Sequence, residues 1–115
     1  MGELMAELDE IRAFIIERHT HKAIGEMQND LEKAISYYFK VGDWFNEAQE
    51  EYEKKHAQEI GKIERMNEQT ETIRAALLKA SLAQEKRRVQ DFKLMQQSLK
   101  QIEMTLWQAL KMRSA

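Results

Sequence analysis

The chain has 115 residues, a formal net charge of -2, 33% charged and 43% hydrophobic residues, no cysteine and no proline. Without cysteine, the chain has no disulfide, no thiolate nucleophile and no cysteine-bound zinc site. The absence of proline and the presence of only four glycines favour helices over strands and turns. The length predicts one helical domain over residues 1–115. No apolar run reaches the roughly 18 residues of a membrane span, and the start MGELMAELDE is acidic, so we expect a cytoplasmic protein with no membrane partner.

The first predicted helix covers residues 3–18. Its apolar residues at helical spacing are Leu4, Leu8, Ile11 and Ile15. The helix is expected to end near the segment HTHKAIG, where Thr20 can cap a following helix and Gly25 is a weak helix breaker. A bent but continuous helix is the alternative at this point.

The second predicted helix covers residues 21–66. Its apolar stripe alternates steps of four and three residues, the heptad pattern, at Met27, Leu31, Ala34, Tyr38, Val41, Phe45, Ala48 and Tyr52. The pattern passes through Gly42 and Asp43 without losing phase, which favours a continuous helix. The alternative is a turn, in which Gly42 ends one helix and Asp43 caps the next.

The polar run NEQTET, residues 67–72, is the best candidate for the main chain reversal, because Asn67, Thr70 and Thr72 can each cap a following helix. A third helix is predicted over residues 71–112. Its seven-residue pattern includes Leu78, Leu82, Glu85, Val89, Phe92, Met95, Leu99, Ile102, Leu106 and Ala109. The step from Phe92 to Met95 breaks the alternation, an irregularity that locally overwinds a supercoil.

These elements predict an all-α fold, either an elongated helical hairpin or a three-helix, antiparallel, coiled-coil-like bundle. Such a monomer buries limited surface, so we expect a homo-oligomer to complete the core. The segment YYFKVGDWF, residues 37–45, holds five of the nine aromatic residues, and its acidic surroundings favour packing against a helix or subunit over base stacking. The candidate oligomer contacts are Tyr37, Tyr38, Phe39, Trp44, Phe45, Phe92, Leu99, Trp107 and Leu110.

The charge is distributed unevenly along the chain. Residues 1–72 hold 9 Lys/Arg and 17 Asp/Glu, a net charge of -8, whereas residues 73–115 hold 9 Lys/Arg and 3 Asp/Glu, a net charge of +6. Basic side chains along a helix can contact the phosphates of a nucleic acid. The candidate nucleic-acid-binding residues are Lys79, Lys86, Arg87, Arg88, Lys93 and Lys100. Equally, Arg87 and Arg88 can pair with Glu50, Glu51 or Glu53 of an antiparallel neighbour.

No motif of catalysis or cofactor binding occurs in the sequence. Glu53 and His56 form one Glu-x-x-His pair, but a di-iron bundle needs two such pairs and further carboxylates, and His19 and His21 lie on different faces of any helix. No phosphate-binding glycine loop, His-Glu-x-x-His motif or nucleophile elbow is present. We therefore expect no enzymatic activity, no catalytic residue, no metal, no cofactor and no small-molecule substrate.

The order of segments resembles small helical proteins of bacteriophages and prophages. An acidic amphipathic start is followed by an aromatic helix ending in EYEKKHAQE, a polar break, and RAALLKASLAQEKRRVQDFKLMQQSLKQIEMTLWQAL. In plan this is similar to UvsY-type recombination mediators. The resemblance implies a homo-oligomer that binds single-stranded DNA and assists a recombinase. We expect such a non-enzymatic accessory protein, which binds single-stranded nucleic acid or a recombination protein through its basic C-terminal helix. The alternative is a structural or protein-binding coiled-coil factor, acting in phage assembly, as a chaperone or as an inhibitor of a host protein.

Overall fold

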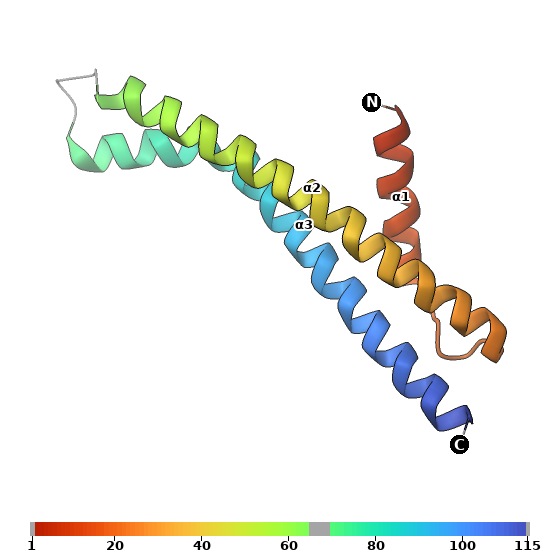
Figure 1. The fold of residues 1–115 in the computed structure, drawn as a ribbon. Helices are drawn as coiled ribbons and strands as arrows, with labels where there is room; N and C mark the ends of the chain where they lie inside the picture. Colours follow the sequence, from red (N-terminus) through yellow and green to blue (C-terminus); the bar gives the residue numbers. More distant parts are fainter. Residues whose placement is uncertain (1, 65–69, 115) are drawn as a thin grey trace. The chain divides into compact units, whose positions relative to one another are not determined.

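The computed structural model of the chain describes residues 2–64 and 70–114. Three helices account for most of them: α1 (Gly2–Ile16), α2 (Ile24–Glu64) and α3 (Glu71–Ser114), with 15, 41 and 44 residues (Figure 1). The two described stretches contain no strand, which confirms the predicted all-α class. The helices begin and end within a few residues of the predicted positions, but Met66 and Asn67 lie outside the described residues. Oligomerisation stays a prediction.

Helix α2 continues through Gly42 and Asp43 without a turn, as the unbroken heptad pattern favoured. Gly42 lies where α3 comes close, because a Cβ atom added at this position would lie 2.8 Å from Nε2 of Gln96. The glycine therefore leaves room for the neighbouring helix rather than ending its own.

The chain divides into two compact units. Unit 1 consists of Met1–Gly42 and Leu94–Ala115, and unit 2 consists of Asp43–Lys93. Each unit contains one segment of α2 and one segment of α3, and α1 belongs to unit 1. The prediction of a single domain over residues 1–115 stays a prediction.

The core of unit 1 lies between antiparallel segments of α2 and α3. Met27, Leu31 and Leu106 form a buried cluster. The partly buried residues packed against this cluster are Ile35, Ile102, Ala109 and Leu110. All of these except Ile35 and Leu110 belong to the predicted heptad patterns, which therefore mark the buried sides of both helices.

Helix α1 packs against α2 through its own apolar side. Ile11 and Phe14 are buried, and the ring of Phe14 meets the edge of Tyr37 with centroids 5.2 Å apart. Tyr37 donates a hydrogen bond to Glu10 Oε1 at 3.1 Å, and the burial of the phenol together with this bond raises its pKa. Lys40 pairs with Glu7 at 2.7 Å. Tyr37 therefore binds α1 within the chain.

Unit 2 is a two-helix antiparallel arrangement. Its buried apolar residues are Ala48, Ile63, Leu82 and Phe92. The ring centroids of Trp44 and Phe92 lie 6.0 Å apart.

Helix α3 begins after Thr70. The Oγ1 atom of Thr70 accepts a hydrogen bond from the backbone N–H of Ile73 at 3.4 Å. This is the capping role that the polar run predicted for Thr70.

Across the described residues, no helix has both the length and the apolar composition that crossing a bilayer requires. The predicted cytoplasmic location stays a prediction.

Candidate functional site

Three exposed lysines of unit 2 lie along one side of α3. Lys79, Lys86 and Lys93 are each seven residues apart, and all three are exposed. Seven residues are nearly two helical turns, so successive lysines shift by only about 20° around the helix axis. Arg87 is exposed next to this row. Together the three lysines and Arg87 form a basic surface on unit 2, which we call the lysine row.

A small pocket lies beside the lysine row. Its volume is about 220 Å³, and it lies between Tyr52 and His56 of α2 and Lys79 and Lys86 of α3. Three further lining residues supply apolar surface: Ala75, Leu78 and Leu82. The rings of Tyr52 and His56 have centroids 5.9 Å apart and an interplanar angle of 31°. Two aromatic residues and two lysines therefore line one concave surface.

Two other predicted basic residues have partners within the chain. Arg88 pairs with Glu51 at 3.3 Å, and its guanidinium carbon lies 5.8 Å from the centroid of Phe92. Lys100 belongs to unit 1, where it pairs with Glu103 at 3.4 Å and lies 5.7 Å from the centroid of Tyr38. The structure thus places Lys79 and Lys86 at a pocket, whereas Arg88 takes part in the helix-to-helix pairing that was the alternative.

A second ion pair joins the helices of unit 2. Lys55 donates a hydrogen bond to Glu85 Oε1 at 2.7 Å. This hydrogen bond is the main reason why the pKa of Glu85 lies below its ordinary value. Glu85 occupies a heptad position, and its acidic side chain is matched there by a lysine from the facing helix.

The candidate oligomer contacts separate into buried and exposed residues. Phe92 and Leu99 are only 5% and 0% exposed, so the chain's own helices already cover them and they offer no surface to a second copy. Tyr37 and Trp44 contact Phe14 and Phe92 within their units. Phe39 and Trp107 remain 67% and 57% exposed. The half-buried candidates are Tyr38, Phe45 and Leu110.

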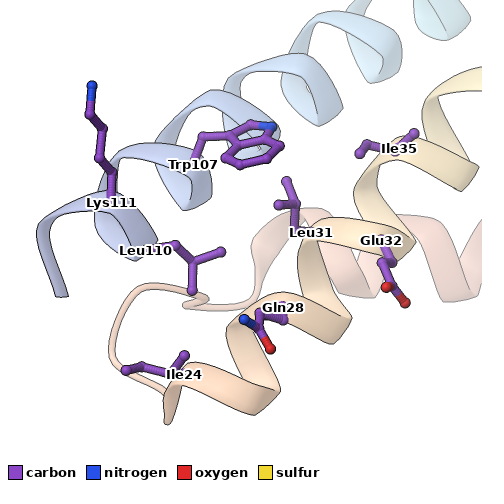
Figure 2. Close-up of a pocket in the computed structure, with 8 residues that line it drawn as sticks. All are labelled: Ile24, Gln28, Leu31, Glu32, Ile35, Trp107, Leu110 and Lys111. Atoms are coloured by element: carbon purple, nitrogen blue, oxygen red, sulfur yellow. The ribbon is translucent and has the colours of Figure 1, made fainter. Parts of the chain in front are cut away.

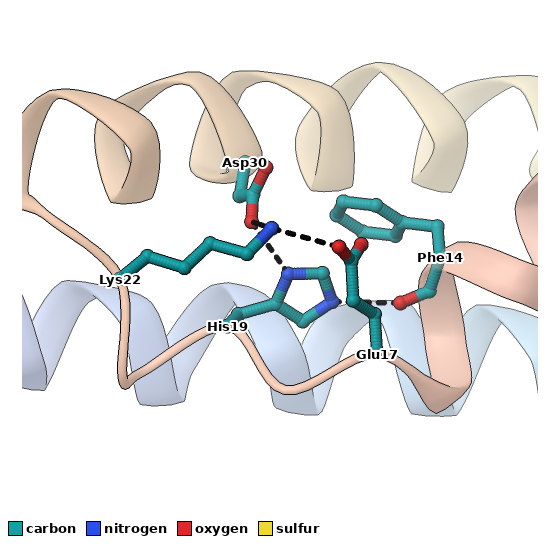
Figure 3. A network of polar contacts seen from close by, with 5 residues as sticks. All are labelled: Phe14, Glu17, His19, Lys22 and Asp30. Carbon is teal, nitrogen blue, oxygen red and sulfur yellow. Dashed lines mark hydrogen bonds and ion pairs between the residues drawn. The ribbon is translucent and has the colours of Figure 1, made fainter.

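A buried polar cluster lies where α1, α2 and the segment between them meet (Figure 3). His19 and Asp30 are only 5% and 6% exposed. The His19 ring lies between Asp30 Oδ2, 2.7 Å from Nδ1, and the carbonyl oxygen of Phe14, 2.7 Å from Nε2. Each ring nitrogen therefore lies within hydrogen-bond distance of an oxygen atom. His19 therefore ties the end of α1 to the first turns of α2.

Lys22 completes this cluster. Its ammonium donates to Asp30 Oδ2 at 2.7 Å and to Glu17 Oε1 at 2.9 Å, and the bond to Asp30 is the main reason why the pKa of Lys22 is raised. Burial raises the pKa of Asp30, but the hydrogen bonds from Lys22 and His19 outweigh burial and hold it below its ordinary value. Arg113 donates to the carbonyl oxygen of Lys22 at 2.6 Å, which also ties the end of α3 to this segment.

Glu17, His19 and Asp30 bring three possible metal-ligand atoms within 4.8 Å of one another, the one such group that the described ranges contain. Lys22 already supplies a cation to both carboxylates, and both ring nitrogens of His19 already bond to acceptors. This arrangement fits an internal ion-pair network better than a metal site. Glu53 and His56, the pair considered from sequence, belong to no such group among the described residues.

The local sequence did not predict the contact between His19 and Asp30. His19 and Asp30 are 11 residues apart, and His19 lies in the non-helical segment before α2, where helical periodicity says nothing about side-chain direction.

No family model, curated protein or solved structure matches the chain. The resemblance to UvsY-type mediators therefore stays a prediction.

Proposed function

We propose that this chain is a non-enzymatic accessory protein that binds single-stranded nucleic acid through unit 2. The observation that carries the proposal is the pocket in which Lys79 and Lys86 face Tyr52 and His56. Single-strand binders combine basic side chains, which contact the backbone phosphates, with aromatic rings, on which unpaired bases stack. Both kinds of group border the same pocket here.

The lysine row extends this pocket along the helix. Lys93 continues the seven-residue spacing, and Arg87 adds a charge beside Lys86. Seven helical residues rise about 10.5 Å. Successive lysines of the row are therefore spaced so that each can contact a different phosphate of one extended single strand. The aromatic partners come from Tyr52 and His56, not from the segment YYFKVGDWF.

The test is the binding of a fluorescent single-stranded oligonucleotide, measured by anisotropy across a salt series. The wild-type chain is expected to bind at low salt, with an affinity that falls as salt rises. The double variant Lys79→Gln with Lys86→Gln is expected to weaken binding and to lower the salt slope by about 1.4, because about 0.7 is lost with each phosphate contact on a single strand.

The matched control is the double variant Lys33→Gln with Lys54→Gln. It removes the same charge from two exposed lysines of α2 that do not line the pocket. Equal weakening in both double variants would show that only net charge matters and would overturn the assignment of the site. Absence of binding by the wild-type chain at low salt would overturn the function itself.

A structural or protein-binding coiled coil is the second candidate. It is supported by the ion pairs of Arg88 with Glu51 and of Lys55 with Glu85, because both engage opposite charges between α2 and α3 without a ligand. On this reading Arg88 stabilises unit 2, and the variant Arg88→Gln lowers the stability of the chain without changing the affinity for an oligonucleotide.

A further inference from the structure

An apolar groove opens between α2 and α3 in unit 1 (Figure 2). Its volume is about 680 Å³. Ile24, Leu31 and Ile35 line it from α2, and Trp107 and Leu110 line it from α3. Trp107 is 57% exposed, although an indole ring is among the most favourable groups to bury. An open apolar groove with an exposed tryptophan at its edge is typical of a surface that receives another protein.

Helix α1 does not cover this groove. The α1 residue Ile15 borders a different depression, together with Leu94 and Ile102 of α3, and the two sets of lining residues share no member. The contacts of α1 with Tyr37 and Lys40 of α2 also lie away from the groove, because neither residue lines it. Within unit 1 the groove is therefore free of α1.

Apolar surface continues beyond the groove along α2. Phe39 lies one helical turn after Ile35 and is 67% exposed. The segment of α2 in unit 1, from Ile24 to Gly42, is about 28 Å long, and two neighbouring helices are about 18 Å wide. Such a face covers on the order of 500 Å², so two copies packed face to face bury on the order of 1,000 Å², the lower limit for a specific interface.

The charged residues at the edges of the groove differ in sign. Glu32 lies on the α2 side, and Lys111 lies on the α3 side. A twofold axis parallel to the helices places α2 of one copy against α3 of the other, so each acidic edge faces a basic edge. The same rotation keeps each residue at its height along the helices, so it brings Trp107 of each copy toward the apolar wall of the other copy's groove at the level of Ile35. The face is therefore complementary to itself in charge, and it carries both an exposed ring and an apolar wall to receive one.

We propose that this groove is the interface of a symmetric dimer and that its occupant is a second copy of the chain. The inference goes beyond nucleic-acid binding, because it concerns unit 1 and its test contains no nucleic acid. The small buried area makes the dimer weak, with a dissociation constant on the order of micromolar.

The first test is the mass of the full chain, measured by analytical ultracentrifugation over a concentration series. The wild-type chain is expected to pass from monomer to dimer. Trp107→Glu is expected to raise the dissociation constant by at least about 30-fold, because it replaces an apolar contact of the interface with a charge that loses its water on binding. Leu94→Glu is the matched control, because Leu94 is 56% exposed on the same helix and borders the other depression. It is expected to leave the dimer unchanged.

The second test reverses the edge charges. Glu32→Lys and Lys111→Glu are each expected to weaken the dimer, and the double variant is expected to restore it. A different protein in the groove would keep its own charges, so recovery in the double variant is specific to a second copy. A double variant no better than the single variants would overturn the proposal. A wild-type chain that stays monomeric throughout would overturn it too and would leave the groove to a helix of another protein.

Discussion

Nδ1 of His19 lies 2.7 Å from Oδ2 of Asp30, and both side chains are buried. This pair joins the non-helical segment after α1 to the second turn of α2. With Lys22 it forms the buried polar cluster of unit 1, so the stability of this unit is expected to depend on it.

Asp30→Asn is expected to lower the free energy of unfolding by about 3 kcal/mol, because the Lys22 ammonium and the buried His19 ring then lose the carboxylate that they share. The measurement is urea unfolding at pH 7, followed by circular dichroism at 222 nm. Asp9→Asn is the control. Asp9 pairs with Arg12 at 4.0 Å on an exposed surface, and its loss is expected to cost less than about 0.5 kcal/mol. Equal effects of the two substitutions would contradict the role of the buried pair.

The contribution of Asp30 is expected to disappear in acid. Its pKa in the folded chain lies below the ordinary value of 3.8, so the stability it provides is complete above that value and is lost as the pH falls through the folded pKa. The difference in unfolding free energy between the wild-type chain and Asp30→Asn should therefore shrink as the pH falls from 7 to 3. A difference that stays constant over this range would contradict the assignment.

The contribution of Lys22 to stability is expected to be lost at high pH. Its pKa lies above the ordinary value of 10.5 in the folded chain, so its contribution is complete below that value and is lost as the pH rises through the folded pKa. The difference in urea midpoint between the wild-type chain and Lys22→Met should be constant from pH 7 to 9 and should narrow above about 10.5. A difference that narrows already between pH 7 and 9 would contradict this.

Gly61→Ala is expected to stabilise the chain by roughly 0.5 to 1 kcal/mol, because alanine is the better helix former and an added Cβ meets no atom within 4 Å. Gly42→Ala is the comparison. Its Cβ would lie 2.8 Å from Nε2 of Gln96, so that side chain has to move and the gain should be smaller. Urea unfolding of both variants measures the difference, and a larger gain at Gly42 would show that α3 does not approach α2 as described.

Thr70→Ala is expected to cost about 1 kcal/mol, because it removes the oxygen that accepts a hydrogen bond from the backbone N–H of Ile73. Thr72→Ala is the control, since Thr72 lies inside α3 and is exposed, where alanine is the better residue. Thermal unfolding should show a lower midpoint for the first variant alone. Equal midpoints would show that Thr70 does not cap the helix.

Much of the fold could be predicted because helix formation depends on residues three and four positions apart. The heptad pattern from Met27 to Tyr52 marked the buried side of α2 and favoured a helix that continues through Gly42, which the structure confirms. The same rule located Leu99 and Leu106 in the core. The pattern did not show whether Phe92 and Leu99 are buried by another helix of the same chain or by a second copy, because it says nothing about which helix packs against them.

The candidate site could be predicted only in part. Charge along the chain pointed to Lys79 and Lys86, but their proximity to Tyr52 and His56 depends on the register between α2 and α3. The same register pairs Arg88 with Glu51 rather than with Glu50 or Glu53. A shift of one helix along the other would change every such partner without changing the sequence pattern of either.

By itself the sequence determined the helical class, the approximate ends of the helices and the sides that are buried, because these follow from periodicity and capping over a few residues. Only the tertiary structure decided that His19 and Asp30 meet, since a non-helical segment has no periodicity that directs its side chains. Only it decided that Trp107 is left exposed at the edge of a groove while Leu99 is covered, because burial is set by the segments that pack together.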